Sequence, residues 1–326
     1  MRLAPLVAVV SLTACAPLSE GMPEEVKRRT PIGMLNIDVY EGEPSNTFSL
    51  TIGVNDYSDY DRSLGQEVGT SDLSGAVNDA LLWWRVSNTI GVPIPRIRVL
   101  TTPSMLDAPW QIGQGASGSS MGGASHDEIL AGIGWLTTSL AKDPTAGGLL
   151  TFSGHGLHLD GNLALAPADL SGKDLDNAIP YATIAKMLEE AGVAAQVTVV
   201  LDTCQAADPT AVAGRTGRAL AGPEAPAGAA TALPRSRERI LTAADLGAPS
   251  FEAYLGGQAH GAFTWSMVML TERWELSREE NRSLATVSYG ELTRRTGLLL
   301  DVLGLDQTPR LYGQDGVEGL PFLSIG

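Results

Sequence analysis

The chain has few cysteines and few basic residues, and both shortages exclude classes of protein. Its 326 residues include two cysteines, Cys15 and Cys204. Neither a disulfide framework nor a cysteine-based zinc site is therefore expected. Lysine and arginine total 22 against 37 acidic residues, which gives a formal net charge of −15. Nucleic-acid binding needs clustered basic side chains to contact phosphates, so we expect no nucleic-acid partner.

The N-terminal hydrophobic run is too short to span a membrane as a helix. Arg2 precedes an apolar run of about ten residues, within the range of a signal-peptide core, whereas a spanning helix needs about 20. The run ends in Leu12-Thr13-Ala14-Cys15, which resembles the lipobox of bacterial lipoproteins. In that family the cysteine is lipidated and becomes the new first residue. The alternative is an ordinary signal peptide that happens to contain a cysteine.

The lipoprotein resemblance implies a domain plan and a location. Residues 1–14 are expected to be a signal peptide, residues 15–45 a lipidated tether and linker, and residues 46–326 one domain. Residue 16 is alanine rather than aspartate, which by similarity to enteric lipoproteins implies the outer membrane. The expected location is the cell envelope, at the periplasmic face of the outer membrane, with the membrane contacted through the lipid anchor.

From residue 46 onwards, apolar runs alternate with helical patterns, which predicts a parallel α/β sheet. Strands are predicted at residues 48–54, 97–100, 148–152, 197–201 and 239–243. Helices are predicted from the spacing of apolar residues at 73–84, 184–191 and 263–274. Two more are predicted to start at the capping boxes Ser125-His126-Asp127-Glu128 and Ser288-Tyr289-Gly290-Glu291. Residues 205–238, rich in Ala, Gly, Pro and Arg, are predicted to form a flexible insertion.

Two of the predicted strands end in residues that can carry chemistry. Ser153-Gly154-His155-Gly156 follows one strand, and Asp202-Thr203-Cys204 follows the next. Sites in open parallel sheets form outside the carboxyl ends of strands, and neighbouring strands lie about 4.8 Å apart. If these two strands are neighbours, the imidazole and the thiol lie side by side, and the thiol can become a reactive thiolate. We therefore interpret Cys204 as a nucleophile and His155 as its general base.

Together with other short motifs, these residues resemble the caspases and metacaspases, the cysteine peptidases of the C14 type. The histidine precedes the cysteine by 204 − 155 = 49 residues, close to the spacing of about 50 that is typical of caspases. The other matching segments are Ile52-Gly53-Val54-Asn55, Gly75-Ala76-Val77-Asn78-Asp79-Ala80, Gly261-Ala262-Phe263-Thr264 and Gln307-Thr308-Pro309. Their order along most of the chain makes the resemblance specific.

The resemblance implies an α/β/α sandwich with a six-stranded, mostly parallel sheet. It also implies a thiol protease whose partner is a peptide or protein substrate. The backbone N–H groups of Gly156 and Cys204 would form the oxyanion hole. Metacaspase-like enzymes cleave after Arg or Lys with acids in the specificity pocket. The matching positions here are Asp79 and Asp202, with Ser153 nearby. No cofactor or metal is implied, and calcium activation stays open.

The chain departs from the metacaspase pattern at two places. Gln205-Ala206-Ala207 follows Cys204 where metacaspases commonly have His-Ser-Gly, and Ala76 stands where several relatives carry cysteine. Both departures leave the shape of the pocket open. The insertion lies where caspases carry the linker between their subunits, so self-cleavage there is a hypothesis. Its candidate sites are Arg215, Arg218, Arg235 and Arg237.

Two other functions remain as alternatives. A caspase-like fold can serve as a scaffold or binding module. Gly118-Ser119-Ser120-Met121-Gly122 has the pattern of a nucleophile elbow, which would make Ser120 the nucleophile of a serine esterase, although no strand is predicted before it. His260, next to Gly261, is interpreted as a residue at a helix start rather than as a catalytic group.

Overall fold

The central sheet has seven strands in the part of the chain that the structure, a computed structural model, describes. That part comprises residues 45–102, 120–159, 162–172, 175–203, 233, 237–245, 248–276 and 287–323. The strands are β1 (Thr47–Val54), β2 (Ile97–Thr102), β3 (Ser120–Gly122), β4 (Gly147–Ser153), β8 (Val197–Asp202), β9 (Arg239–Thr242) and β12 (Arg310–Tyr312). Their order is β12-β9-β8-β4-β1-β2-β3, and every neighbouring pair is parallel except β12 with β9.

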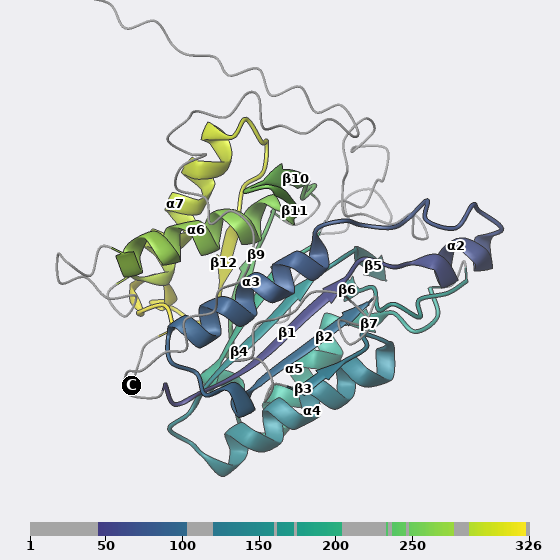
Figure 1. Ribbon diagram of the computed structural model, residues 1–326. Helices are drawn as coiled ribbons and strands as arrows, with labels where there is room; N and C mark the ends of the chain where they lie inside the picture. Colours follow the sequence, from purple (N-terminus) through teal and green to yellow (C-terminus); the bar gives the residue numbers. More distant parts are fainter. Residues whose placement is uncertain are drawn as a thin grey trace, which may run out of the picture.

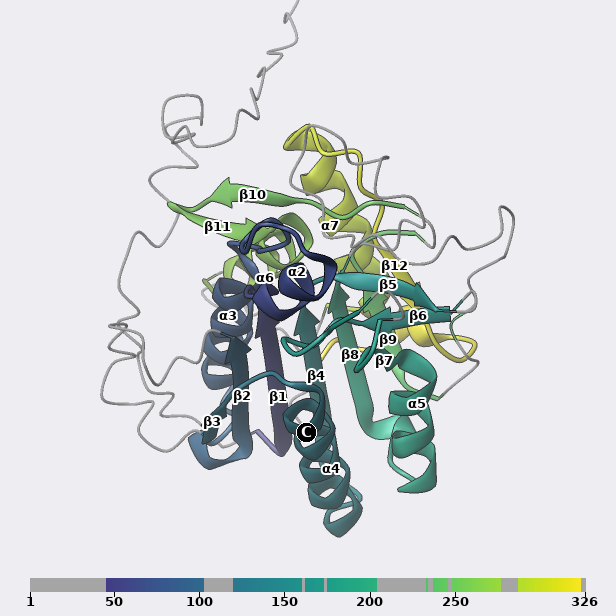
Figure 2. The same ribbon diagram turned by 90° about the vertical axis from the view of Figure 1, so that its right-hand side faces the viewer.

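Helices cover both faces of this sheet (Figures 1 and 2). One face carries α3 (Ala76–Thr89), α6 (Ala262–Leu276) and α7 (Tyr289–Val302), and the other carries α4 (His126–Lys142) and α5 (Tyr181–Glu190). A short helix, α2 (Ser58–Leu64), lies beyond the carboxyl end of β1. Single 3-10 turns occur at Ile94–Arg96, Ala194–Gln196 and Val317–Gly319. The predicted α/β/α sandwich with a mostly parallel sheet is confirmed, and the three-residue β3 adds one edge strand to the expected six.

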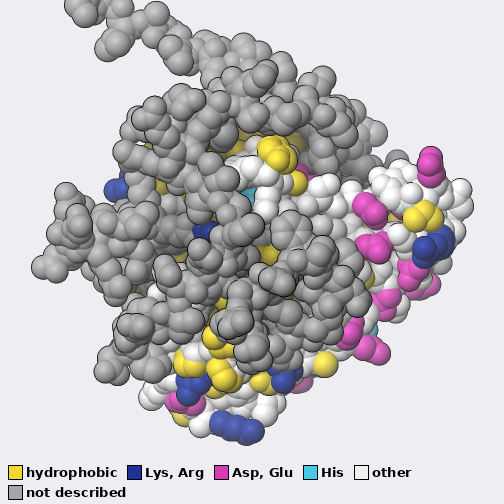
Figure 3. Space-filling model, viewed as in Figure 1, with side chains coloured by type: hydrophobic (Ala, Val, Ile, Leu, Met, Phe, Trp, Pro, Cys, Tyr) yellow, Lys and Arg dark blue, Asp and Glu magenta, His cyan; other side chains and the backbone are white. Residues whose placement is uncertain are grey.

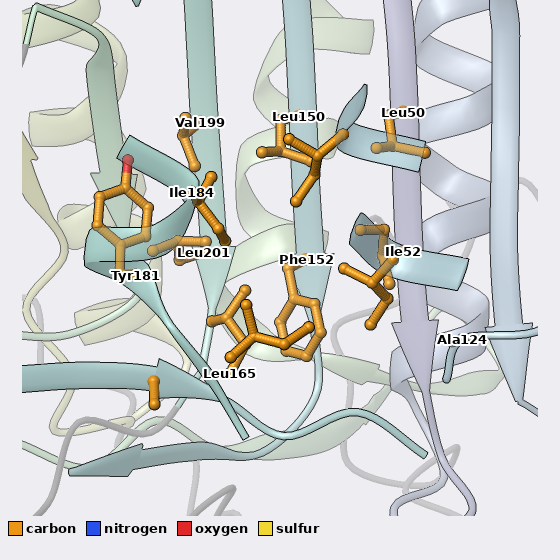
Figure 4. Packing of buried hydrophobic residues seen from close by; sticks show 14 of the residues in the cluster. Leu50, Ile52, Ala124, Leu150, Phe152, Leu165, Tyr181, Ile184, Val199 and Leu201 are labelled. Carbon is orange, nitrogen blue, oxygen red and sulfur yellow. The ribbon is translucent and has the colours of Figure 1, made fainter. Parts of the chain in front are cut away.

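Strand residues alternate between two hydrophobic cores because successive side chains point to opposite faces of a sheet. Leu150 and Phe152 of β4 belong to the core under α4 and α5, whereas Leu149 packs with Trp83 of α3 on the opposite side. Figure 4 shows Phe152 beside Leu201 and Leu165 in the first of these cores. Burial on both faces explains why apolar residues stand at consecutive positions in β4 and β8 rather than alternating with polar ones.

Two smaller sheets lie outside the central one. A three-stranded sheet contains β5 (Gly156–Leu159), β6 (Asn162–Leu165) and β7 (Ile179–Pro180), and a hairpin contains β10 (Glu252–Leu255) and β11 (Gln258–Gly261). The sequence did not predict these strands, because each has at most four residues. Both sheets begin or end beside residues of the candidate site.

The helix starts show how far local sequence decides structure. The capping box of Ser125 and Glu128 forms at the start of α4, as predicted. At α7, Ser288 accepts the Glu291 N–H, but the Glu291 carboxylate binds arginines of its own helix. The prediction of a full capping box there is therefore half right.

Helix α3 begins three residues later than predicted. Its first amides, those of Ala76 and Val77, donate to Oδ1 of Asn55 at 2.9 and 3.2 Å. The cap is thus supplied by a residue 21 positions earlier in the chain, at the end of β1. Leu73, which the pattern assigned to the helix, is buried in the loop before it.

No helix among the described residues has the length and apolar character needed to cross a membrane. The predicted signal peptide, tether and lipidation site at Cys15 lie outside the described residues.

Candidate active site

The two strands that end in the predicted dyad are neighbours. β4 and β8 pair in parallel, with Ser153 opposite Asp202 at their carboxyl ends. His155 follows Ser153 by two residues, and Cys204 follows Asp202 by two residues. Cys204 itself lies outside the described residues. The expected adjacency of the strands is confirmed, and it is the condition under which the two residues can meet.

The site lies at the point where the strand order of the sheet reverses. β2 lies on one side of β1, whereas β4, β8 and β9 follow on the other side. In open α/β sheets the crevice at the carboxyl ends of such strands is the usual place for a ligand. The ends of β1, β4 and β8 therefore border the candidate site.

His155 is fixed by a hydrogen bond to a backbone carbonyl. Its side chain is buried, and Nε2 lies 2.7 Å from the carbonyl oxygen of Ser71. A carbonyl oxygen only accepts, so the proton of the neutral imidazole is on Nε2 and the lone pair is on Nδ1. Nδ1 is consequently the atom of His155 that can act as a base.

Tyr57 holds the same histidine from the end of β1. Its hydroxyl accepts the backbone N–H of His155 at 2.8 Å, and the two ring centroids are 4.5 Å apart. A side chain at Gly154 would meet that hydroxyl at 2.8 Å. The glycine before His155 is therefore required by the approach of Tyr57.

The loop that carries the Ser71 carbonyl is organised by a buried acid, Asp61 of α2. Asp61 is completely buried, and its Oδ2 accepts the backbone N–H groups of Gly69 at 2.8 Å and Ser71 at 3.3 Å. Burial raises the pKa of the neighbouring Tyr60, and the negative charge of Asp61 raises it further. Asp61 thus positions the backbone that in turn orients His155.

Gly156 lies where its amide can face a ligand. The Ala166 N–H donates to the His155 carbonyl oxygen at 3.1 Å. Hydrogen-bonded and non-hydrogen-bonded pairs alternate along an antiparallel ladder, so the next pair, Gly156 and Leu165, is not hydrogen-bonded to each other. The Gly156 N–H therefore points away from β6. β5 is an edge strand of its small sheet, so this amide lies on the open edge.

The three predicted substrate-binding residues come together. Ser153 Oγ donates to Asp79 Oδ2 at 2.5 Å. Asp202 lies at the end of the adjacent strand and accepts the hydroxyl of Ser250 at 3.0 Å and the N–H of Thr264 at 2.9 Å. The two aspartates are 0% and 1% exposed. Any cation that reaches them is therefore shielded from water, which strengthens an ion pair.

His260 and Gly261 both contact the Asp79 carboxylate, and the interpretation of His260 as a helix-start residue is wrong. His260 belongs to β11, and its Nδ1 lies 3.1 Å from Asp79 Oδ1. The Gly261 N–H donates to both oxygens of Asp79, at 3.1 and 3.0 Å. A methyl group at Gly261 would overlap the Asp202 carboxylate and lie 2.7 Å from Asp79 Oδ2. The absence of a side chain there lets the carboxylates converge.

Exposed acidic side chains lie on α2 and the loop that follows it. Figure 3 shows Asp and Glu side chains gathered on the side of the molecule where α2 lies. Asp59, Glu67 and Asp72 are among the exposed residues of this segment. Since the segment also contains Ser71, the negative surface adjoins the candidate site.

The geometry at Ser120 does not fit a nucleophile elbow. Such an elbow places the serine on a sharp turn between a strand and a helix, whereas Ser120 begins the edge strand β3 and pairs with Arg98 of β2. Within the described residues, no group of three or more His, Cys, Asp or Glu side chains could hold a metal ion.

Sequence analysis missed five residues that position the site: Tyr57, Asp61, Ser71, Ser250 and His260. Four of them act through a contact with a residue far away in the chain, and His260 is 181 residues from Asp79. Asp61 instead binds amides 8 and 10 residues further along the chain. For part of this network the sequence contained a signal, namely the segments Ile52–Asn55 and Gly75–Ala80 that resemble caspase and metacaspase motifs. Asn55 of the first segment caps the helix that carries Asp79 of the second.

Comparisons with known proteins support the fold alone. No protein-family model matches the chain, and no curated protein matches it. Among solved structures, the chain is similar to the crystal structure of protein GSU0716 from Geobacter sulfurreducens, with a TM-score of 0.55 and 16% sequence identity. The match covers 86% of this chain and 99% of that one. At this identity the likeness extends to the arrangement of strands and helices.

Proposed function

We propose that the protein is a cysteine endopeptidase of the caspase–metacaspase type that cleaves after arginine or lysine. The observation that carries the proposal is the state of His155. The Ser71 carbonyl binds Nε2, so the basic nitrogen is Nδ1. The pairing of β4 with β8 also supports it, because these neighbouring strands end two residues before His155 and Cys204 in the chain.

In the acylation step, Nδ1 of His155 takes the thiol proton of Cys204. The thiolate attacks the scissile carbonyl carbon, and the negative charge develops on the carbonyl oxygen. The N–H groups of Gly156 and Cys204 would donate to that oxygen. Nδ1 then returns its proton to the leaving nitrogen, the C–N bond breaks, and a thioester to Cys204 remains.

Water completes the reaction with the same two side chains: His155 now activates water, and Cys204 is the leaving group. Nδ1 of His155 takes a proton from water, and the resulting hydroxide attacks the thioester carbon. The C–S bond breaks, the sulfur regains the proton from the imidazolium, and the carboxylic acid product loses its remaining proton to solvent and leaves as a carboxylate. The Ser71 carbonyl stabilises the imidazolium in both halves by accepting its Nε2–H.

The negative charge of the proposed pocket favours substrates that have a basic residue on the amino side of the cleaved bond. Asp79 and Asp202 present two carboxylates to one small region, and a guanidinium or ammonium can pair with both. An aspartate side chain would be repelled there. The exposed acids near α2 add long-range attraction for basic peptides, which raises association rates.

The test is hydrolysis of fluorogenic peptides that differ only in the residue before the cleaved bond. The assay is run with and without added calcium. We expect cleavage after Arg and Lys, and loss of cleavage in Cys204→Ala and His155→Asn. Two matched controls should retain activity: Cys15→Ala, which removes the other cysteine, and His126→Asn, a partly exposed histidine paired with Asp127. If no peptide is cleaved under any condition, the scaffold alternative is favoured.

Specificity is tested separately from the dyad. Asp79→Asn and Asp202→Asn should each lower kcat/KM for the arginine peptide by about tenfold to a hundredfold, because a hydrogen bond to a charged group contributes about 1.5–3 kcal/mol. The same variants should affect a citrulline peptide far less. Preferential cleavage after aspartate would contradict the pocket.

We further propose self-cleavage in the insertion at residues 205–238. This segment lies almost entirely outside the described residues, and it contains four arginines. The intact mass of the active protein should show cleavage after arginine that is missing in Cys204→Ala. Identical masses would exclude self-processing.

The location in the cell envelope is also a proposal. Cys15 in the lipobox-like segment would carry the lipid, and the chain would start there after processing. Metabolic labelling with a palmitate analogue should mark the wild-type chain and leave Cys15→Ala unlabelled. Labelling of both would place the lipid elsewhere.

A further inference from the structure

Two arginines and two aromatic rings stack on one another at the amino end of the central sheet. Cζ of Arg96 lies 4.7 Å from the centre of the Phe48 ring, and Cζ of Arg98 lies 4.4 Å from the centre of the Trp135 ring. The two rings meet edge to face, with centroids 5.9 Å apart. All four side chains are half-buried, so each keeps part of its surface towards solvent. We call these four residues the aromatic–arginine cluster.

The helix that supplies Trp135 has no acidic residue along most of its length. From Ile129 to Lys142, α4 contains neither aspartate nor glutamate. Ala131, Thr138 and Lys142 are exposed, and their spacing of three or four residues from Trp135 or from each other places them on the same helix face. Figure 3 shows hydrophobic and basic side chains together at the lower edge of the molecule, in the region of α4, away from the acidic side chains near α2. In a chain with a net charge of −15, this surface is an exception.

Asp143 borders this surface, directly after the end of α4. Hydrogen bonds from Thr145 lower the pKa of Asp143, and the positive charge of Arg96 lowers it further. Asp143 therefore contributes a negative charge that Arg96 offsets. Since Arg98 and Lys142 add two more positive charges, these residues together are net basic.

The N-terminal segment joins the domain at this same end. Asn46 donates its side-chain amide to Thr145 Oγ1 at 2.9 Å and accepts from Nη1 of Arg96 at 2.7 Å. Cys15 precedes Ser45 by 45 − 15 = 30 residues, and a chain of that length spans at most about 100 Å. A lipid on Cys15 would therefore keep the domain close to a bilayer and hold it from the end that carries the aromatic–arginine cluster.

The candidate active site lies at the other end of the same strands. β1 has eight residues, and at about 3.3 Å per residue it is about 25 Å long. Its amino end carries Phe48, and its carboxyl end borders the candidate site. A bilayer that touches the aromatic–arginine cluster would leave the site facing the aqueous compartment.

We propose that the aromatic–arginine cluster and the adjoining face of α4 rest on a membrane that contains anionic phospholipid. This inference rests on the proposed lipid anchor at Cys15 and is independent of the proposed peptidase activity. Tryptophan favours the headgroup level of a bilayer. A guanidinium stacked on a ring keeps its edge N–H groups available for phosphate oxygens. Each basic residue near an anionic surface strengthens the contact about fivefold, and the anchor supplies the second attachment that stable membrane binding needs.

The experiment locates the bilayer with a fluorescent probe at either end of the domain. The mature lipidated chain carries Cys204→Ala, so that the one free thiol is the one introduced for labelling. Thr138→Cys places the probe on the exposed face of α4, and Glu67→Cys places it in the exposed loop after α2. Each labelled protein is reconstituted into phosphatidylethanolamine vesicles with or without phosphatidylglycerol. Nitroxide-labelled lipids quench a probe at the bilayer, and iodide quenches a probe in water.

On vesicles with phosphatidylglycerol, we expect the probe at residue 138 to be quenched by the nitroxide lipids and shielded from iodide. The probe at residue 67 should show the opposite behaviour. Lys142→Glu should raise the ratio of iodide-accessible to lipid-contacting probe at residue 138 by at least about fivefold. Lys186→Glu is the matched control, because Lys186 is an exposed lysine of α5 that pairs with Glu190, and it should leave the ratio unchanged.

The outcomes separate this inference from the two proposals made above. Equal quenching of the two probes on anionic vesicles would overturn the orientation and leave the lipid anchor intact. Equal effects of Lys142→Glu and Lys186→Glu would overturn the role of the basic face of α4. A mature chain that does not float with the vesicles would contradict the anchor at Cys15, and this inference with it. Peptide hydrolysis by the wild-type chain in detergent tests the peptidase whichever of these results is found.

Discussion

The hydroxyl of Tyr57 stands between the backbone N–H of His155 and the carbonyl of Ala166. It accepts from the first at 2.8 Å and donates to the second at 3.3 Å, while the Ala166 N–H still donates to the His155 carbonyl at 3.1 Å. In a regular antiparallel ladder the N–H and the carbonyl would bond directly. The hydroxyl replaces one bond of the ladder and fixes the backbone of His155 to the end of β1.

Tyr57→Phe should therefore destabilise the protein and impair the candidate base. The change leaves a buried N–H and a buried carbonyl without the bridging hydroxyl, which costs about 1–3 kcal/mol. Denaturant unfolding measures the stability, and peptide hydrolysis measures kcat. Tyr254→Phe is the control, because Tyr254 is 42% exposed on β10 and its change should have an effect below about 0.5 kcal/mol. Equal stabilities of the two variants would refute the bridging role.

Asp61 should matter for catalysis although it does not touch His155. Asp61→Ala removes the acceptor of the Gly69 and Ser71 amides, so the Ser71 carbonyl loses its fixed direction. We expect a loss of about 1–3 kcal/mol in stability and a lower kcat with little change in KM.

The matched control for Asp61 lies in the same helix. Asp59 is exposed and pairs with Arg62 at 2.7 Å, and surface pairs contribute about 0–1 kcal/mol. Asp59→Ala should leave kcat unchanged. If the two alanine variants behave alike, Asp61 has no positioning role.

Gly261→Ala should disrupt the carboxylate pair. The added methyl overlaps the Asp202 carboxylate and presses on Asp79, and overpacking of this kind costs about 1–3 kcal/mol. Cleavage after arginine should fall more than cleavage after citrulline. Gly134→Ala in α4 is the opposite case, because a methyl there meets nothing within 4 Å and should stabilise the helix by up to about 1 kcal/mol. A stable Gly261→Ala protein with unchanged selectivity would show that the close approach is unnecessary.

Asn55 should be required for the placement of Asp79. Asn55→Ala removes the acceptor of the first two amides of α3, and loss of an N-cap costs about 0.5–2 kcal/mol. Asn55→Asp keeps the acceptor and should retain most of the stability. Thermal unfolding of the two variants checks this, and equal loss in both would point to the Asn55 amide group instead.

The sequence by itself determined the layered architecture of this protein, a central sheet with helices on both faces. Apolar runs buried on both faces predicted the central parallel strands, and the spacing of buried residues predicted the helices on either side, because these patterns follow from burial alone. The same reasoning placed Ser153, His155 and Asp202 at strand ends, and the structure brings those ends together. The local cap of α4 was also predictable, since both of its partners lie within four residues.

Only the tertiary structure decided how the site is held. Tyr57, Ser71 and His260 reach their partners across 98, 84 and 181 residues. Their contacts are hydrogen bonds of hydroxyl, carbonyl and imidazole groups, which leave no periodic pattern in the sequence. The short strands of the two small sheets are likewise stabilised by neighbours distant in the chain. The sequence thus determined which residues could carry the chemistry, whereas packing at the ends of β1, β4 and β8 decided their orientation and their charged surroundings.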